Sequence, residues 1–334
     1  MSTSRKISAR IVRGTARNLA ALAAALRRGE IVGVPTETVY GLAANALDAA
    51  ACRRIFRAKG RPATDPLIVH LASAGDLAGV AVPNSAAYRL AAAFWPGPLT
   101  IVLPKRSVIP DAVSAGLPSV AVRVPSHPLF RRLLKLADIP LAAPSANLFG
   151  YVSPTTAEHV RAGLGKKVRL ILDGGPCGIG LESTIIDLRQ PKKPRLLRPG
   201  AVTRAQLEQV LGRPVQDAPK KPRSKSKAQV APGMLTRHYS PRTPVVLHAR
   251  LTPEMVHAYR SDEAWLFLTK PKGLRAKNVH ELAPRGDLRA AARKLFDALR
   301  TLDTAGYRRI HAELAPGTGL ADAINDRLRR AAAR

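Results

Sequence analysis

The stretch that decides the fold is Gly33-Val-Pro-Thr-Glu-Thr-Val-Tyr-Gly41. It continues a short β-branched apolar run, Ile31 to Val34, which predicts a buried strand. Pro35 ends that strand because its ring fixes φ and removes the N–H donor. The turn that follows carries hydroxyl, carboxylate and phenol groups on Thr36, Glu37, Thr38 and Tyr40. The sequence therefore predicts a strand end that presents polar groups, with Gly41 allowing another backbone to approach closely.

A second polar segment, Arg57-Ala-Lys-Gly-Arg-Pro62, follows about one helix later. Asp48 can cap that helix, and Lys59 and Arg61 flank the glycine at its end. A guanidinium binds phosphate as a fork, whereas an ammonium binds it as a point charge. Together with the polar strand end, Lys59 and Arg61 predict a binding site for a charged small molecule with phosphates.

Further short motifs follow in a fixed order. They are Trp95–Thr100, Val122–Pro125, Ala143–Asn147, Ser153–Glu158, Glu182–Thr184, Leu197–Gly200, Ala231–Met234 and His238–Pro241. Together with the first two segments, these motifs resemble the YrdC-like family over residues 12–212. The last two resemble the joining segment of that family's long, two-domain form. So many ordered elements make the resemblance far more specific than a single motif would.

The expected architecture is an α/β protein of two domains. The resemblance implies a YrdC-like twisted, mixed, open sheet with flanking helices over residues 1–212. Residues 213–243 mix prolines with lysines and arginines, which predicts a basic linker that ends in a lid motif. Strands alternate with helices over residues 244–334, which predicts a smaller Rossmann-like α/β domain. Thr155 with Glu158 fits the cap of one helix in the first domain.

Composition limits the class of protein. The chain has 334 residues and 46% hydrophobic content, which is ample for two cores. Its net charge of +31 fits either a bias toward arginine or an anionic partner, and both explanations stay open. Cys52 and Cys177 are the only cysteines, so we expect reduced thiols and a cytoplasmic location. No apolar run approaches the roughly 20 residues of a membrane span, so we expect no membrane contact.

Several kinds of catalytic site are excluded by their missing motifs. The chain has no P-loop, no H-E-x-x-H, no cysteine pair at metal spacing, no G-x-S-x-G and no G-x-G-x-x-G. We therefore expect no metal site built by the protein. A site made of Lys, Arg, Ser, Thr and Asn works by binding, orientation and charge stabilisation.

The family resemblance implies a nucleotidyltransferase. The long form is expected to make L-threonylcarbamoyladenylate from L-threonine, bicarbonate (or CO2) and ATP, with release of pyrophosphate. The product would serve N6-threonylcarbamoyladenosine modification of tRNA by downstream partner proteins. Mg²⁺ is expected to enter with ATP, and no organic cofactor is expected.

The family's motifs also imply roles for single residues. Lys59 and Arg61 are expected to be catalytic. L-Threonine is expected to contact Thr36, His70, Arg123, Ala143 and Ser183. ATP is expected to contact Lys59, Arg61, Ser119, Ser145, Asn147, Ser153, Arg198 and Tyr239, the last as part of a lid. Asp65 departs from the asparagine usual in the family, and its charge is expected to weaken ATP binding slightly.

Two of these residues have a second explanation. His70 lies on an apolar strand, where a lone histidine is commonly a core residue with satisfied hydrogen bonds. Arg123 alternates with Val120, Val122 and Val124, so it lies on the other face of a strand. There it either pairs with an acid or binds an anion, and the resemblance favours the anion.

Two other functions compete with this interpretation. An RNA-binding module of the YrdC-like fold, without adenylate-forming activity, would also be basic. The chain lacks RRM aromatics and a KH loop, and its aromatic content of 4% gives little for bases to stack on. We therefore expect at most a weak tRNA contact. A carbamoyl-phosphate-handling domain, as in hydrogenase maturation factors, would carry acylphosphatase and zinc-finger regions, which this chain lacks.

Overall fold

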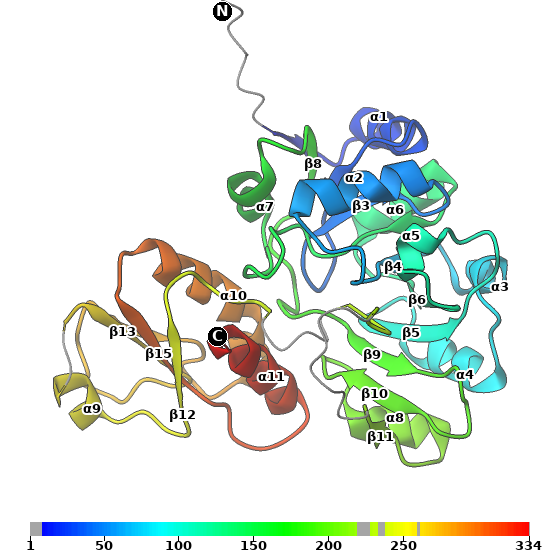
Figure 1. Cartoon of the computed structure of the whole chain (residues 1–334). Coiled ribbons are helices and arrows are strands. Elements are labelled where there is room, and N and C mark those ends of the chain that lie inside the picture. Colours follow the sequence, from blue (N-terminus) through cyan, green and yellow to red (C-terminus); the bar gives the residue numbers. More distant parts are fainter. Residues whose placement is uncertain (1–8, 219–227, 233–237, 259–260, 334) are drawn as a thin grey trace, which may run out of the picture.

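A computed structural model describes residues 9–218, 228–232, 238–258 and 261–333. They form two units that lie side by side, each built on its own sheet (Figure 1). The expected basic run of the linker falls largely at 219–227, outside the described residues. Within the described residues no helix combines the length and apolar content needed to cross a bilayer.

The larger unit is organised by a mixed sheet of eleven strands. Their order is β1-β8-β2-β3-β7-β4-β6-β5-β9-β10-β11, with both parallel and antiparallel neighbours. The strands are β1 Arg10–Arg13, β2 Val32–Val34, β3 Gly41–Asn45, β4 Ile68–His70, β5 Leu99–Pro104, β6 Ser119–Arg123, β7 Leu141–Ala142, β8 Leu170–Asp173, β9 Thr184–Asp187, β10 Arg195–Arg198 and β11 Gln216–Asp217. This arrangement confirms the predicted mixed sheet, and it extends the sheet into the start of the expected linker.

Helices cover this sheet and begin largely where the sequence predicts. They are α1 Ala16–Arg27, α2 Ala49–Lys59, α3 Leu77–Val80, α4 Ser85–Phe94, α5 Asp111–Ser114, α6 Pro128–Ala137, α7 Ala157–Leu164 and α8 Arg204–Leu211, with a 3-10 turn at Ala74–Asp76. The Asp48 carboxylate caps α2 by accepting from the N–H groups of Ala50 and Ala51. The predicted Thr155 cap is wrong, because the Thr156 hydroxyl accepts from the His159 N–H and begins α7 one residue later.

The smaller unit has four parallel strands in the order β12-β15-β13-β14. The strands are β12 Val245–His248, β13 Glu263–Phe267, β14 Val279–Glu281 and β15 Arg309–Glu313, and the helices are α9 Pro253–Ala258, α10 Leu288–Thr304 and α11 Leu320–Ala332. The prediction of a small α/β unit with alternating strands and helices is thereby confirmed.

One apolar cluster joins the two units. It packs Phe296 of α10 and Leu328 of α11 together with Val39, Leu181 and Tyr239. Val39 belongs to the turn after β2, and Leu181 precedes β9. The helices of the smaller unit therefore support the same segments that carry polar groups in the larger unit.

Candidate functional site

The polar turn after β2 opens onto a pocket at the ends of several strands. Of the residues expected to bind substrates, the structure brings nine to the wall of this pocket: Thr36, Arg61, His70, Arg123, Ala143, Ser145, Ser183, Arg198 and Tyr239. Gly41 pairs with Ser145 in an isolated bridge, and a Cβ on it would meet the Ala143 Cβ at 3.2 Å. This is the close backbone approach that the sequence predicts at that glycine.

The other four expected residues are buried but lie outside the pocket wall. They are Lys59, Ser119, Asn147 and Ser153. Ser119 begins β6 at the opposite end from Arg123, about 13 Å away at ~3.3 Å per strand residue. Ser119 is therefore remote from the part of the pocket where β4 and β6 pair His70 with Arg123.

Arg61 is fixed on the wall by its own turn. Its Nε donates to the Asp65 carbonyl at 2.9 Å and its Nη2 to the Pro66 carbonyl at 2.6 Å. The Asp65 carboxylate forms a buried ion pair with the same guanidinium at 3.0 Å. Burial raises the pKa of Asp65, and the charge of Arg61 opposes that rise. Asp65 therefore orients Arg61 as well as adding negative charge beside it.

Lys59, the last residue of α2, organises the neighbouring turn. Its Nζ donates to the carbonyls of Ser145 at 2.5 Å and Asn147 at 2.6 Å. Burial lowers the pKa of Lys59 well below its usual range, and the charge of Arg61 adds to that effect. An ammonium has three donors, so one proton of Lys59 is left for a ligand.

Arg123 is already paired with an acid. Its Nη2 lies 2.6 Å from Glu37 Oε1, its Nη1 donates to Thr38 Oγ1 at 3.0 Å and its Nε donates to the Gly97 carbonyl at 3.1 Å. Burial raises the pKa of Glu37, but the charge of Arg123 together with hydrogen bonds from Arg123 and from backbone N–H groups keeps that pKa below its usual value. Arg123 therefore does pair with an acid. Because it also lines the pocket, the expectation that it binds an anion stays a prediction.

His70 fits both of its explanations. It is buried, its Nδ1 lies 3.2 Å from the Ile68 carbonyl, and its ring packs on Phe130 with centroids 5.5 Å apart. It also lines the pocket. Burial, reinforced by the charge of Arg123, lowers the pKa of His70 to about 3. The imidazole is therefore neutral near pH 7 and contributes shape and hydrogen bonding to the wall, without a positive charge.

Ser183 and Arg198 form the side of the pocket nearest β9 and β10. The Arg198 Nε donates to the Ser183 carbonyl at 3.0 Å, and its Nη2 donates to the Ser183 hydroxyl at 3.1 Å. Ser183 Oγ also lies 2.8 Å from Thr100 Oγ1. These bonds fix a hydroxyl and a guanidinium together on the wall.

Tyr239 and His238 cover the pocket. Both are buried, and their rings make an edge contact with centroids 4.1 Å apart. Tyr239 has φ of 59°, a conformation that bulky residues rarely adopt, and the next N–H, on Ser240, donates to the Gly150 carbonyl at 2.8 Å. Only about 40 Å³ remains free beneath them. A nucleotide needs several hundred Å³, so the cover must move to admit one.

Three wall residues with polar side chains were missing from the expected set: Thr38, Glu182 and His238. Each is the direct neighbour of an expected residue in sequence or lies within the same motif. That proximity is the signal that could have identified them. Glu182 is the least expected chemically, because it places a buried carboxylate in a pocket rich in guanidinium groups.

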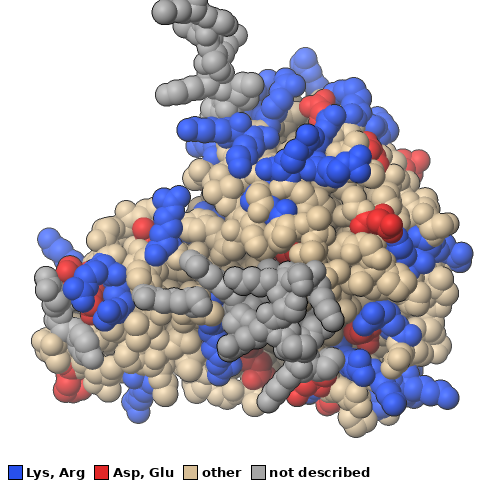
Figure 2. All heavy atoms as spheres, in the orientation of Figure 1, with Lys and Arg blue, Asp and Glu red and all other residues tan. Residues whose placement is uncertain are grey.

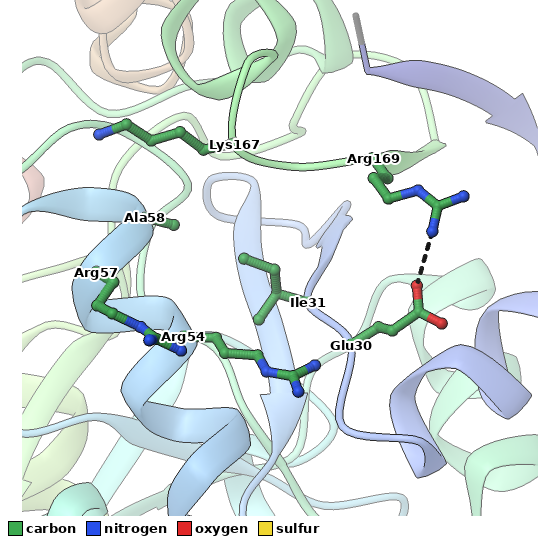
Figure 3. A pocket seen from close by; sticks show the side chains of 7 residues that line it. All are labelled: Glu30, Ile31, Arg54, Arg57, Ala58, Lys167 and Arg169. Atoms are coloured by element: carbon green, nitrogen blue, oxygen red, sulfur yellow. Dashed lines mark ion pairs between the residues drawn. The ribbon is translucent and has the colours of Figure 1, made fainter. Parts of the chain in front are cut away.

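A second hollow lies elsewhere, between α2 and the segment that leads into β8. It has a volume of about 480 Å³, and four basic side chains (Arg54, Arg57, Lys167 and Arg169) line it with Glu30, Ile31 and Ala58 (Figure 3). Figure 2 shows many lysines and arginines on this part of the surface. It contains none of the expected substrate residues, so it is a basic surface separate from the polar pocket.

Metal binding by the protein is not evident in the part of the chain that the structure describes. No group of three His, Cys, Asp or Glu residues there is arranged to hold an ion.

Comparisons with known proteins cover nearly the whole chain. A family model described as "Telomere recombination" matches residues 24–200, and one described as "Threonylcarbamoyl-AMP synthase, C-terminal domain" matches residues 202–333. The threonylcarbamoyl-AMP synthase of Pyrococcus abyssi is 42% identical over 316 residues, covering 92% of this chain and 91% of that protein. The Bacillus subtilis protein of the same name is 41% identical over 329 residues, with coverage of 94% and 92%.

A solved structure agrees with the sequence comparisons. The crystal structure of P. abyssi Sua5 complexed with L-threonine aligns with a TM-score of 0.88 at 40% identity and covers 96% of each chain. At this coverage the agreement extends over both units.

Proposed function

The chain belongs to the threonylcarbamoyl-AMP synthase family in its two-domain form, and from this membership we propose that its covered pocket makes L-threonylcarbamoyl-AMP. The substrates are L-threonine, bicarbonate and ATP, and the second product is pyrophosphate. The observation that carries the proposal is the convergence of three guanidinium groups and several hydroxyls on one pocket beneath Tyr239. Such a set suits an amino acid carboxylate beside a triphosphate.

The chemistry needs two anions held side by side. The threonine amine first takes up bicarbonate to give a carbamate and water. A carbamate oxygen then attacks the α-phosphorus, the bond to the bridging oxygen breaks, and pyrophosphate leaves with the electron pair. Positioned cations lower this barrier because they offset charge already present and charge that develops. Mg²⁺ enters as part of the ATP substrate and neutralises the leaving group.

The residues divide between the two substrates. We assign Arg123, Thr36, His70, Ala143 and Ser183 to L-threonine, at the end of the pocket where β4 and β6 finish. We assign Lys59, Arg61, Ser145, Asn147, Ser153, Arg198 and Ser119 to ATP. The pairing of Arg61 with Asp65 and of Lys59 with two carbonyls supports fixed cations at the triphosphate end. The threonine carboxylate has to share Arg123 with Glu37.

The lid and the domain division belong to the same proposal. Residues 1–212 form the catalytic unit, 213–243 the joining segment and 244–334 the supporting unit. Tyr239 covers the pocket during the reaction and excludes water from a reactive mixed anhydride. The product then passes to cytoplasmic proteins that modify tRNA.

The direct test is synthesis by the full chain. Purified protein with Mg²⁺, L-threonine, bicarbonate and ATP is expected to release pyrophosphate and yield L-threonylcarbamoyl-AMP, measured by chromatography and mass spectrometry. Omission of any one of the three substrates should abolish the product. Pyrophosphate release that does not depend on L-threonine would contradict the proposal. Tight tRNA binding without any synthesis would favour the RNA-binding alternative.

The basic hollow of Figure 3 supports a weak tRNA contact. It offers four cations and no aromatic side chain, a composition that suits phosphates and gives no base stacking. Arg54→Glu with Arg57→Glu is expected to weaken tRNA binding about tenfold at low salt. Fluorescence anisotropy with a labelled tRNA transcript at two salt concentrations would measure this.

The matched control for this contact is the double variant Arg132→Glu with Lys135→Glu, at two exposed positions on α6. It should leave tRNA affinity near wild type, and the Arg54 and Arg57 variant should still make L-threonylcarbamoyl-AMP at near the wild-type rate. Equal losses of tRNA affinity in both variants would show that net charge alone is responsible, and the contact would then be rejected.

A further inference from the structure

The C-terminal helix α11 places a buried arginine against the pocket of the larger unit. Arg327 is 0% exposed, and its Nε donates to Glu182 Oε2 at 2.9 Å. Its Nη1 donates to the Pro199 carbonyl at 3.0 Å and to Asp326 Oδ2 at 2.8 Å. Its Cζ lies 5.3 Å from the centroid of the Tyr239 ring. A single side chain thus contacts both the wall of the pocket and its cover.

Glu182 is a buried carboxylate, and Arg327 supplies the positive charge that balances it. It lines the pocket, is 5% exposed, and accepts a hydrogen bond from Ser153 Oγ at 2.5 Å. A buried carboxylate without a cation would repel an incoming triphosphate and would itself be costly. Arg198 is the other cation close to Glu182, but its Nε and Nη2 are bonded to Ser183. Arg327 is therefore the group that neutralises Glu182.

The same arginine also supports the cover. The Tyr239 ring contacts both the Arg327 guanidinium and the ring of Phe296 of α10, whose centroid is 5.5 Å away. A cation over the face of a tyrosine is attracted by the ring's electrons, more strongly where water is excluded. Because Tyr239 has an unfavourable positive φ, packing from both C-terminal helices has to hold it there.

We propose that Arg327 is a positioning residue of the synthesis reaction, which neutralises Glu182 at the pocket wall and holds Tyr239 over the pocket. The proposal rests on the function proposed above and extends it to the smaller unit. The C-terminal helix then completes the ATP site without touching ATP. Tight nucleotide binding and protection of the product then both require α11 to be packed against the larger unit.

Kinetics of two variants separate the two roles. Arg327→Met is expected to raise KM for ATP about tenfold or more, with a smaller change in kcat. It should also lower the yield of L-threonylcarbamoyl-AMP per pyrophosphate released, because the cover is loosened. Adding Glu182→Gln removes the carboxylate that lost its partner, so KM for ATP should return to within about threefold of wild type. The low product yield should persist in the double variant.

The matched control is Arg329→Met, at an exposed position on the same helix, which should behave as wild type. Circular dichroism and thermal unfolding would verify the fold, and the double variant leaves no buried charge unpaired. A wild-type KM for ATP in folded Arg327→Met would overturn the inference while the proposed function stands. A raised KM that Glu182→Gln fails to restore would overturn the neutralising role. A wild-type chain that makes no product would instead overturn the proposed function.

Discussion

Replacing Lys59 with methionine is expected to lower kcat/KM for ATP by about 10²- to 10³-fold, the usual loss when one positioned electrostatic donor is removed. Two effects add. The variant removes a buried cation next to Arg61, and it also frees the Ser145 and Asn147 carbonyls that the ammonium now holds. The turn that carries these carbonyls forms part of the pocket wall. Pyrophosphate release at varied ATP and saturating L-threonine would measure the loss.

A control separates loss of this group from loss of charge in general. Lys135→Met, on the exposed side of α6, removes the same charge far from the pocket and should leave kcat/KM unchanged. Two unsatisfied carbonyls cost about 1–3 kcal/mol each, so Lys59→Met should also lower Tm by several degrees yet remain folded at 25 °C. A folded Lys59→Met enzyme with wild-type kcat/KM would exclude Lys59 from the nucleotide site.

Sequence patterns were sufficient for most of the fold. Asp48 caps α2 as the sequence predicts, and the apolar run before Pro35 is the buried strand β2. β3 was not predicted, because Gly41–Asn45 contains alanines and no β-branched residue. Its strand character comes from pairing with β2 and β7, which is tertiary information. No prediction covered α6, although its apolar positions recur at helical spacing.

The sequence predicted which residues line the pocket better than it predicted which residues they pair with. The family motifs brought nine expected residues to one pocket wall, and several of these motifs lie at the ends of strands of the same sheet. The pairing of Arg123 with Glu37 depends on how the turn after Pro35 folds back over β6, and no local pattern encodes that. The contact of Arg327 with Glu182 joins the two units, so it became visible only when their packing was known.

The second large effect is expected at Arg123, which pairs with Glu37 and is assigned to the carboxylate of L-threonine. Arg123→Met is expected to raise KM for L-threonine about 100-fold, because a substrate carboxylate loses a charged, buried hydrogen-bonding partner. KM for ATP should change much less, since Arg123, which pairs in register with His70, is assigned to L-threonine and Arg61 to ATP. Initial rates at varied L-threonine and saturating ATP would give both constants. Arg132→Met, exposed on α6, serves as the control of equal charge.

Glu37→Gln tests the role of Arg123 by removing the carboxylate that pairs with it. The ion pair of 2.6 Å means that Glu37 competes with a substrate carboxylate for Arg123, although it also holds the guanidinium in place. Glutamine keeps the shape and removes the competing charge, so KM for L-threonine should fall. Arg123 would be reassigned to the nucleotide if Arg123→Met raised KM for ATP and left KM for L-threonine unchanged. The expected opposite responses of Arg123→Met and Glu37→Gln follow only if the carboxylate of L-threonine binds at that guanidinium.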